Sequence, residues 1–269
     1  MERTTDVDRG TLRGGLAYFR VGAGWPLVYL PGLTASHRQP RGMDRWFQLG
    51  QVRPFRRHRE VWWVQRPHGM APGATMADIA DGYAVALHEL FDGPVDVIGS
   101  STGGTVALQL AADHPDTLRR LVLLSSACRL GPSGLRAQRA IAEHLRQGRS
   151  REANARMMSM LAGSALGQRA LARIGWLVGP APRGEGVSDM LITIDAENAS
   201  DLTLRLPDIA TPTLVVGGGR DRYYGEEVFR VTASGLPNGR LLLEPDKGHS
   251  ATQTDPKVIG EVIRFLDEP

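Results

Sequence analysis

Residues 95–104 read Val-Asp-Val-Ile-Gly-Ser-Ser-Thr-Gly-Gly. A short β-branched run ends in Gly99-Ser100-Ser101-Thr102-Gly103, and a segment with helical character follows at once. The order strand, Gly-x-Ser-x-Gly, helix is typical of a sharp turn that presents a nucleophilic serine. Such a turn strains the serine backbone, and its neighbours are small because a side chain there would collide with the adjoining strand and helix. Ser101 alone has glycine two residues before and two residues after it, so the sequence predicts Ser101 as the nucleophile.

The nucleophile requires a base, because a serine hydroxyl is a poor nucleophile at neutral pH unless an imidazole accepts its proton. Among the seven histidines, His249 is the best placed. It follows the last predicted strand, 240–243, and precedes the final predicted helix, which begins at Pro256. We therefore expect His249 to reach the same edge of the sheet as Ser101.

The imidazole in turn requires a carboxylate that fixes its tautomer and stabilises the developing cation. Asp221 comes after the glycine run 217–219, at the end of the predicted strand 213–216. The chain order Ser101, Asp221, His249 is the one expected for a nucleophile on this kind of turn. Three other carboxylates remain as alternatives: Asp246, Asp195 and Asp201.

Two backbone N–H groups would form the oxyanion hole, which stabilises the negative charge that attack builds on a carbonyl oxygen. Each such donor is worth on the order of 3 kcal/mol of barrier. We expect one from Thr102, the residue after the nucleophile, and the other from Leu33, in the turn 31–34 that follows the strand-like run 27–30. Gly32 would allow this turn to approach the substrate closely, although a plain turn glycine is the alternative interpretation.

The rest of the chain alternates between strand-like and helix-like segments, which predicts a largely parallel sheet with crossover helices. Residues 11–21 are expected to form an edge strand or a hairpin. The other predicted strands are 27–30, 61–64, 95–98, 121–124, 213–216 and 240–243. The predicted helices are 76–91, 105–112, 226–233 and the segment from Pro256 onward.

Residues 131–200 interrupt this alternation, because their apolar positions recur at helical spacing and no strand is evident. We expect this insertion to form a helical cap over the carboxyl edge of the sheet, within a single domain that spans 1–269. The inner face of such a cap would also be a pocket wall. The predicted pocket residues are Trp46, Trp62, Met157 and Met190, and ordinary core packing is the alternative for the aromatic ones.

Composition narrows the possible functions. The 269 residues carry a net charge of +3, and all of the 32 basic residues except Lys247 and Lys257 are arginine. We interpret the densest run, 53–59, as a solvated loop and expect no nucleic-acid partner.

The single cysteine, Cys128, allows no internal disulfide, fits a reducing compartment and is expected to be a buried thiol. The start shows no apolar signal segment and no run approaches the ~20 apolar residues of a membrane span. We therefore expect a soluble, cytoplasmic protein that does not bind a membrane.

No metal or cofactor is expected. The histidines lack the paired spacing of a metal site, and one cysteine cannot form a thiolate site. Residues 217–219 do not form the glycine fingerprint of a dinucleotide site. The sequence therefore predicts a small-molecule substrate as the only ligand, and it leaves the oligomeric state open.

Taken together, these residues resemble the α/β-hydrolase superfamily over about residues 11–267. The motifs that carry the resemblance are Gly-Ser-Ser-Thr-Gly-Gly, Gly-Gly-Arg-Asp and Gly-His-Ser. The resemblance implies a mostly parallel eight-stranded sheet flanked by helices, with the cap between the sixth and seventh strands. Many relatives have His-Gly in the oxyanion turn, where this chain has Pro31-Gly32. Serine at position 101 argues against the dehalogenase and epoxide-hydrolase branches, which have aspartate there.

The resemblance implies a serine hydrolase that cleaves an ester, thioester or lactone of a small, largely apolar substrate through an acyl-enzyme on Ser101. The same three side chains could instead support acyl transfer, carbon–carbon bond hydrolysis or cofactor-free perhydrolysis, because fold-level analogy does not separate these reactions. A ligand-binding protein on a hydrolase scaffold is a third possibility.

Overall fold

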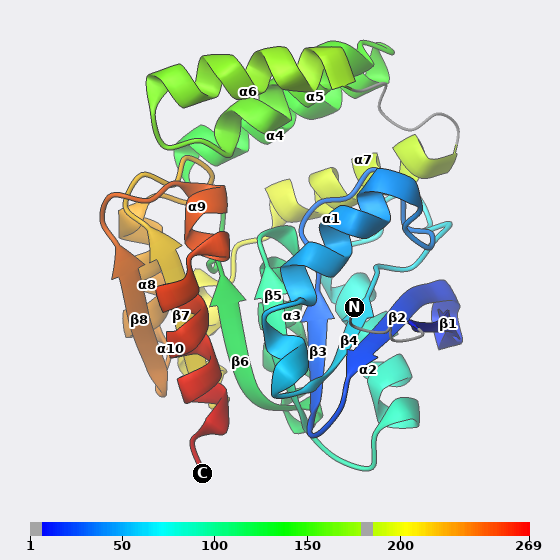
Figure 1. Ribbon diagram of the computed structural model, residues 1–269, viewed down its shortest axis with the longest axis vertical. Coiled ribbons are helices and arrows are strands. Elements are labelled where there is room, and N and C mark those ends of the chain that lie inside the picture. Colours follow the sequence, from blue (N-terminus) through cyan, green and yellow to red (C-terminus); the bar gives the residue numbers. More distant parts are fainter. Residues whose placement is uncertain (1–6, 179–184) are drawn as a thin grey trace, which may run out of the picture.

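The alternating pattern produces an eight-stranded sheet in the computed structural model, which describes residues 7–178 and 185–269. The strand order is β1-β2-β4-β3-β5-β6-β7-β8. β1 and β2 form an antiparallel hairpin at one edge, β2 pairs antiparallel with β4, and the remaining neighbours are parallel (Figure 1). The strands are β1 (Asp8–Leu12), β2 (Leu16–Gly22), β3 (Pro26–Leu30), β4 (Glu60–Val64), β5 (Val95–Ser100), β6 (Leu118–Leu124), β7 (Thr213–Gly218) and β8 (Gly239–Glu244). The predicted mostly parallel eight-stranded sheet is confirmed.

Helices cover both faces of this sheet because successive side chains of a strand point to opposite sides. In β5, for example, Val97 packs into one buried cluster and Ile98 into the other. One face carries α1 (Gly42–Val52) and α10 (Pro256–Asp267), which lie in front of the sheet in Figure 1. The other carries α2 (Met76–Leu90), α3 (Thr102–Asp113) and α8 (Glu226–Gly235). Cys128 is fully buried, as predicted.

Among the described residues, four α-helices lie between β6 and β7: α4 (Pro132–Arg146), α5 (Ser150–Met160), α6 (Ala165–Val178) and α7 (Glu185–Ala199). Figure 1 shows α4, α5 and α6 stacked above the carboxyl ends of the strands. Apolar side chains of α4, α5 and α7 form a small core of their own, and Leu33 packs against it. Residues 179–184 of the predicted insertion 131–200 lie outside the described residues. We refer to α4–α7 as the cap.

None of the described helices is both long enough and apolar enough to cross a lipid bilayer.

Candidate active site

The turn between β5 and α3 presents Ser101. Its backbone has φ 51° and ψ −126°, and α3 begins at the next residue. A residue with a side chain reaches this conformation at a cost of about 1–3 kcal/mol, which the surrounding structure must offset. The neighbouring glycines allow it: a Cβ on Gly103 would overlap the carbonyl oxygen of Leu30, and one on Gly104 would overlap the side chain of Ser126. The small residues are therefore required by close packing against β3 and the end of β6.

Two hydrogen bonds join Ser101, His249 and Asp221, although these residues come from three different turns. His249 begins the short helix α9 (His249–Thr254), which follows β8. The Ser101 hydroxyl donates to Nε2 of His249 over 3.0 Å, and Nδ1–H of His249 donates to Oδ2 of Asp221 over 2.7 Å. His249 and Asp221 are only 2% and 5% exposed, so little water competes for these bonds. A proton can pass from the hydroxyl to the ring while the carboxylate holds the ring in place.

The backbone fixes Asp221 in turn. Its Oδ1 accepts N–H bonds from Tyr223 over 2.8 Å and from Tyr224 over 3.3 Å, which leaves Oδ2 directed at the imidazole. The ring of Tyr224 also lies parallel to that of His249, with an interplanar angle of 12° and 6.2 Å between the centroids. The alternative carboxylates have other partners: Asp246 pairs with Arg220, Asp195 with Arg146, and Asp201 accepts bonds from Thr203.

The two predicted oxyanion residues lie beside Ser101. Thr102 is the first residue of α3, so its N–H has no partner one turn earlier in the helix. Leu33 follows Gly32, where a Cβ would stand 3.2 Å from the Cβ of Ser101. Both residues line one cavity together with Ser101 and His249. The arrangement suits two N–H donors that converge on a carbonyl attacked by Ser101, and their role remains a prediction.

This catalytic cavity has a volume of about 200 Å³ and lies under the cap. None of the described residues that line it is Asp, Glu, Lys or Arg. Its apolar wall consists of Leu33, Phe47, Met157, Met158, Leu161 and Tyr223, and its amide side chains are Gln48, Gln51, Gln138 and Gln253. The cavity therefore offers neutral hydrogen-bonding groups and apolar surface, and no fixed charge for a ligand.

Of the four predicted pocket residues, only Met157 lines this cavity. Trp46 is 77% exposed on α1, whereas Phe47 faces the cavity. A helix turns by about 100° per residue, so neighbouring aromatic residues point in different directions. The sequence prediction of Trp46 was therefore wrong by one position.

Trp62 and Met190 belong to cores. Trp62 packs against the ring of Phe91 on the face of the sheet that carries α2, α3 and α8, and its indole N–H donates to Glu60 over 3.0 Å. Met190 is 2% exposed inside the apolar core of the cap. The alternation of side chains along β4 and the inward face of α7 place both away from the catalytic cavity, so both predictions were wrong.

A buried carboxylate that the sequence reasoning missed connects the cap to the nucleophile turn. Glu197 of α7 is 2% exposed and has four hydrogen-bond donors. They are the hydroxyls of Thr102 (2.9 Å), Thr105 (3.0 Å) and Tyr224 (3.3 Å), and the amide of Gln138 (2.6 Å). Nothing in the sequence around Glu197 distinguishes it from a solvent-exposed helical glutamate, because its partners come from three distant segments.

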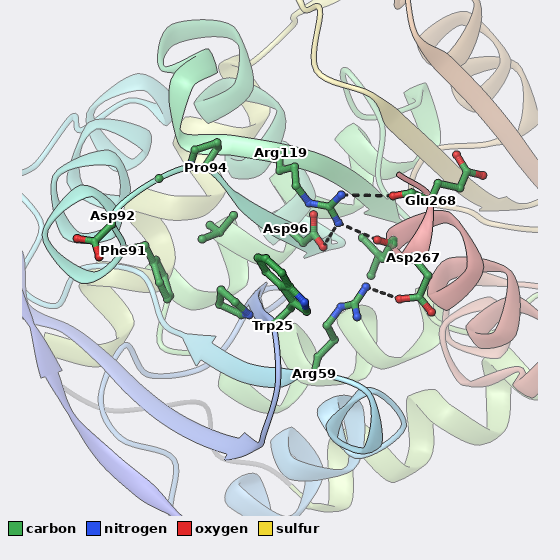
Figure 2. Close-up of a pocket in the computed structure, with 13 residues that line it drawn as sticks. Trp25, Arg59, Phe91, Asp92, Pro94, Asp96, Arg119, Asp267 and Glu268 are labelled. Carbon is green, nitrogen blue, oxygen red and sulfur yellow. Dashed lines mark hydrogen bonds and ion pairs between the residues drawn. The ribbon is translucent and has the colours of Figure 1, made fainter.

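A larger cavity of about 580 Å³ lies at the opposite, amino end of the strands (Figure 2). Figure 2 shows its arginines directed at carboxylates: Arg119 pairs with Asp96 over 2.6 Å, and Arg59 pairs with Asp267. None of the described residues that line it is a serine, cysteine or histidine. The smaller cavity at the carboxyl edge, by contrast, has in its wall a serine hydroxyl that is hydrogen-bonded to an imidazole.

Within residues 7–178 and 185–269, no three histidine, cysteine, aspartate or glutamate side chains are grouped so that they could hold a metal ion.

Comparison with known proteins agrees with this geometry. A sequence model of the Alpha/beta hydrolase family matches residues 27–262. The chain is 30% identical over 212 residues to a pimeloyl-[acyl-carrier protein] methyl ester esterase of Neisseria meningitidis, which covers 75% of this chain and 67% of the relative. It is also 30% identical over 216 residues to lipase LipV of Mycobacterium tuberculosis, which covers 73% of this chain and 78% of the relative. Among solved structures, the enol-lactonase of Burkholderia xenovorans LB400 superposes with a TM-score of 0.77 at 20% identity, over 97% of this chain and all of the other.

Proposed function

The chain belongs to the α/β-hydrolase family, and we propose that it is a serine hydrolase that cleaves esters, thioesters or lactones through an acyl-enzyme on Ser101. The observation that carries the proposal is the pair of hydrogen bonds from Ser101 to His249 and from His249 to Asp221 at the wall of a cavity. An esterase and a lipase among the relatives, and an enol-lactonase with the same fold, support the substrate class.

The proposed reaction has two steps, acylation of Ser101 and hydrolysis of the acyl-enzyme. Ser101 Oγ attacks the substrate carbonyl while His249 Nε2 accepts its proton, and the negative charge on the carbonyl oxygen is stabilised by the N–H groups of Thr102 and Leu33. The carbonyl re-forms as the alcohol, thiol or lactone hydroxyl leaves with the proton from His249. Water then attacks the acyl-enzyme with His249 as the base, which releases the acid and restores Ser101. Asp221 stabilises the imidazolium in both steps.

The catalytic cavity indicates a small, uncharged acyl group. A volume of about 200 Å³ is below the ~300 Å³ at the lower end for drug-sized ligands. At roughly 30 Å³ per water-sized group, it holds about six or seven non-hydrogen atoms. A carboxylate placed there without a partner would pay a large desolvation cost.

The test of the nucleophile uses p-nitrophenyl butyrate as substrate and a fluorophosphonate probe. We expect wild-type protein to hydrolyse the ester and to be labelled at Ser101, and Ser101→Ala to lose both properties while its unfolding transition is unchanged. Ser234→Ala, an exposed serine of α8, is the matched control and should retain both. Folded wild-type protein that neither turns over the ester nor reacts with the probe would refute the proposal.

The test of the substrate class compares p-nitrophenyl butyrate with p-nitrophenyl hemisuccinate, which has a similar length and ends in a carboxylate. We expect kcat/KM to be about 100-fold lower for the hemisuccinate, because the cavity offers no cation to the carboxylate. Equal kcat/KM values for the two esters would show that the acyl group does not enter the neutral cavity.

A further inference from the structure

The oxyanion turn is held from behind by a buried arginine. Arg66 follows β4 by two residues, and no part of its side chain is exposed to solvent. Its guanidinium donates to the carbonyl oxygen of Pro31 over 2.9 Å, to that of Gly32 over 2.9 Å and to the hydroxyl of Thr34 over 3.0 Å. One side chain thus contacts three of the four residues of the turn 31–34.

The fourth partner of the guanidinium is a histidine. Nε–H of Arg66 donates to Nε2 of His37 over 3.2 Å, and Nδ1–H of His37 donates to the carbonyl oxygen of Pro67 over 2.8 Å. This pattern requires a neutral imidazole with its proton on Nδ1. All four guanidinium bonds therefore end on neutral acceptors.

Such an arrangement is costly, because the buried guanidinium loses its hydration and the described residues give it no direct ion pair; the buried carboxylate of Glu197 attracts it only at longer range. Other arginines of the chain pair directly with carboxylates: Arg119 with the buried Asp96, and Arg205 with the partly exposed Asp113. A neutral side chain could hold the turn by hydrogen bonds at a lower desolvation cost. The Arg66 guanidinium therefore points to a role in the reaction at Ser101, on the other side of the turn.

The peptide unit between Gly32 and Leu33 connects the guanidinium to that reaction. The bond between Gly32 and Leu33 is trans, so its C=O and N–H point in opposite directions. Arg66 holds the C=O, and the N–H of Leu33 therefore points away from Arg66. Gly32 itself packs against Ser101, because a Cβ on Gly32 would stand 3.2 Å from the Ser101 Cβ. A hydrogen bond to a carbonyl oxygen also polarises the peptide and strengthens its N–H as a donor.

We infer that Arg66 is a positioning residue for catalysis: its guanidinium orients and polarises the Gly32–Leu33 peptide so that the Leu33 N–H stabilises the oxyanion. This inference rests on the proposed function. Arg66 does not touch the substrate, and its positive charge acts through the peptide on the side where negative charge develops. Binding of the uncharged ground state depends less on this donor than the tetrahedral state does.

The test replaces Arg66 with glutamine, which retains hydrogen-bonding capacity and removes the charge and the fork of donors. Loss of one oxyanion donor costs roughly 100- to 1000-fold in kcat, so we expect Arg66→Gln to lower kcat by about 30- to 300-fold with KM changed less than about threefold. Affinity for a boronic acid, which forms a tetrahedral adduct on Ser101, should fall in proportion to kcat/KM. Rates are normalised to sites titrated to completion with a fluorophosphonate, so that only folded enzyme is counted.

Arg120→Gln is the matched control. Arg120 is a buried arginine of β6 at the amino end of the sheet, where it pairs with Glu268 over 3.7 Å and donates to a main-chain oxygen of Pro269. We expect this variant to be less stable than wild type but to have an unchanged kcat per titrated site. If Arg66→Gln fails to fold, Arg66→Lys decides, because it preserves the charge but not the fork; we expect its kcat per titrated site to fall at least tenfold.

Two results would overturn the inference. One is an active wild-type enzyme whose Arg66→Gln or Arg66→Lys variant keeps the wild-type kcat per titrated site. The other is an equal loss of kcat in Arg66→Gln and Arg120→Gln, which would reduce the role of Arg66 to stability. Both results require an active wild-type enzyme. A wild-type protein without turnover or labelling would instead count against the proposed function itself.

Discussion

Protonation of His37 should make the protein less stable in mild acid. His37 is fully buried, and this burial, together with the charge of Arg66, lowers its pKa from 6.5 to about 3. In the unfolded chain the same ring titrates near its ordinary value. Between these two pKa values the unfolded state binds a proton that the folded state does not, so stability rises with pH and is lost as pH falls below about 6.5. At 1.36 kcal/mol per pH unit, the loss between pH 7.5 and pH 5.0 is about 2 kcal/mol.

The measurement is urea unfolding followed by tryptophan fluorescence at the two pH values, on wild type and His37→Gln. Glutamine can accept from Arg66 and donate to Pro67 but does not titrate. All other groups titrate in both proteins, so the difference between the two pH-dependent losses isolates His37. We expect wild type to lose about 2 kcal/mol more than the variant between pH 7.5 and pH 5.0. Equal losses, or a larger loss in the variant, would mean that His37 does not remain neutral as its contacts with Arg66 require.

Two further predictions concern the packing of the nucleophile turn and the buried carboxylate. In thermal unfolding, Gly103→Ala should destabilise the protein by about 3 kcal/mol or more, because its Cβ overlaps the Leu30 backbone. Gly260 lies in α10 with open space around it, so Gly260→Ala should instead stabilise the protein by about 0.5–1 kcal/mol in this assay. Glu197→Gln should lower the free energy of unfolding by about 1–3 kcal/mol, because its amide N–H₂ faces hydrogen-bond donors. The exposed Glu143→Gln is its control, and a similar change in both variants would contradict this account.

The elements that the sequence predicts well are those with a strong local pattern. The run 95–98, the glycines around Ser101 and the strand-like runs that end in turns are each visible within a few residues. Parallel strands place their carboxyl ends at one edge, so turns after three strands were expected to bring Ser101, Asp221 and His249 together. Topology alone could make this prediction, because it depends on strand direction and not on side-chain packing.

The pocket wall could not be predicted in this way. Trp62 and Trp63 are adjacent in β4, and which of them faces which side of the sheet depends on pairing register. Trp46 and Phe47 differ by one step of a helix whose boundaries the sequence did not reveal, since α1 begins after an arginine without a capping side chain. Met157 and Met190 have similar apolar surroundings in the sequence, and only the packing of the cap separates the cavity from the core.

Arg66 and Glu197, which lie behind the turns around Ser101, could not be predicted from the sequence. Both are buried charged residues at positions where the sequence pattern is that of a solvent-exposed side chain. They lie behind the two expected oxyanion donors: Arg66 holds the Gly32 carbonyl, and Glu197 accepts from the Thr102 hydroxyl. Their elements differ, because Arg66 follows a strand of the sheet whereas Glu197 belongs to α7 of the cap. The cap contacts both sides of the expected oxyanion hole, because the Leu33 side chain packs against the apolar core of the cap and Glu197 binds the Thr102 hydroxyl. Arg66 fixes the backbone on the Leu33 side, so a change in the position of the cap would reach Leu33 through side-chain packing and Thr102 through a hydrogen bond.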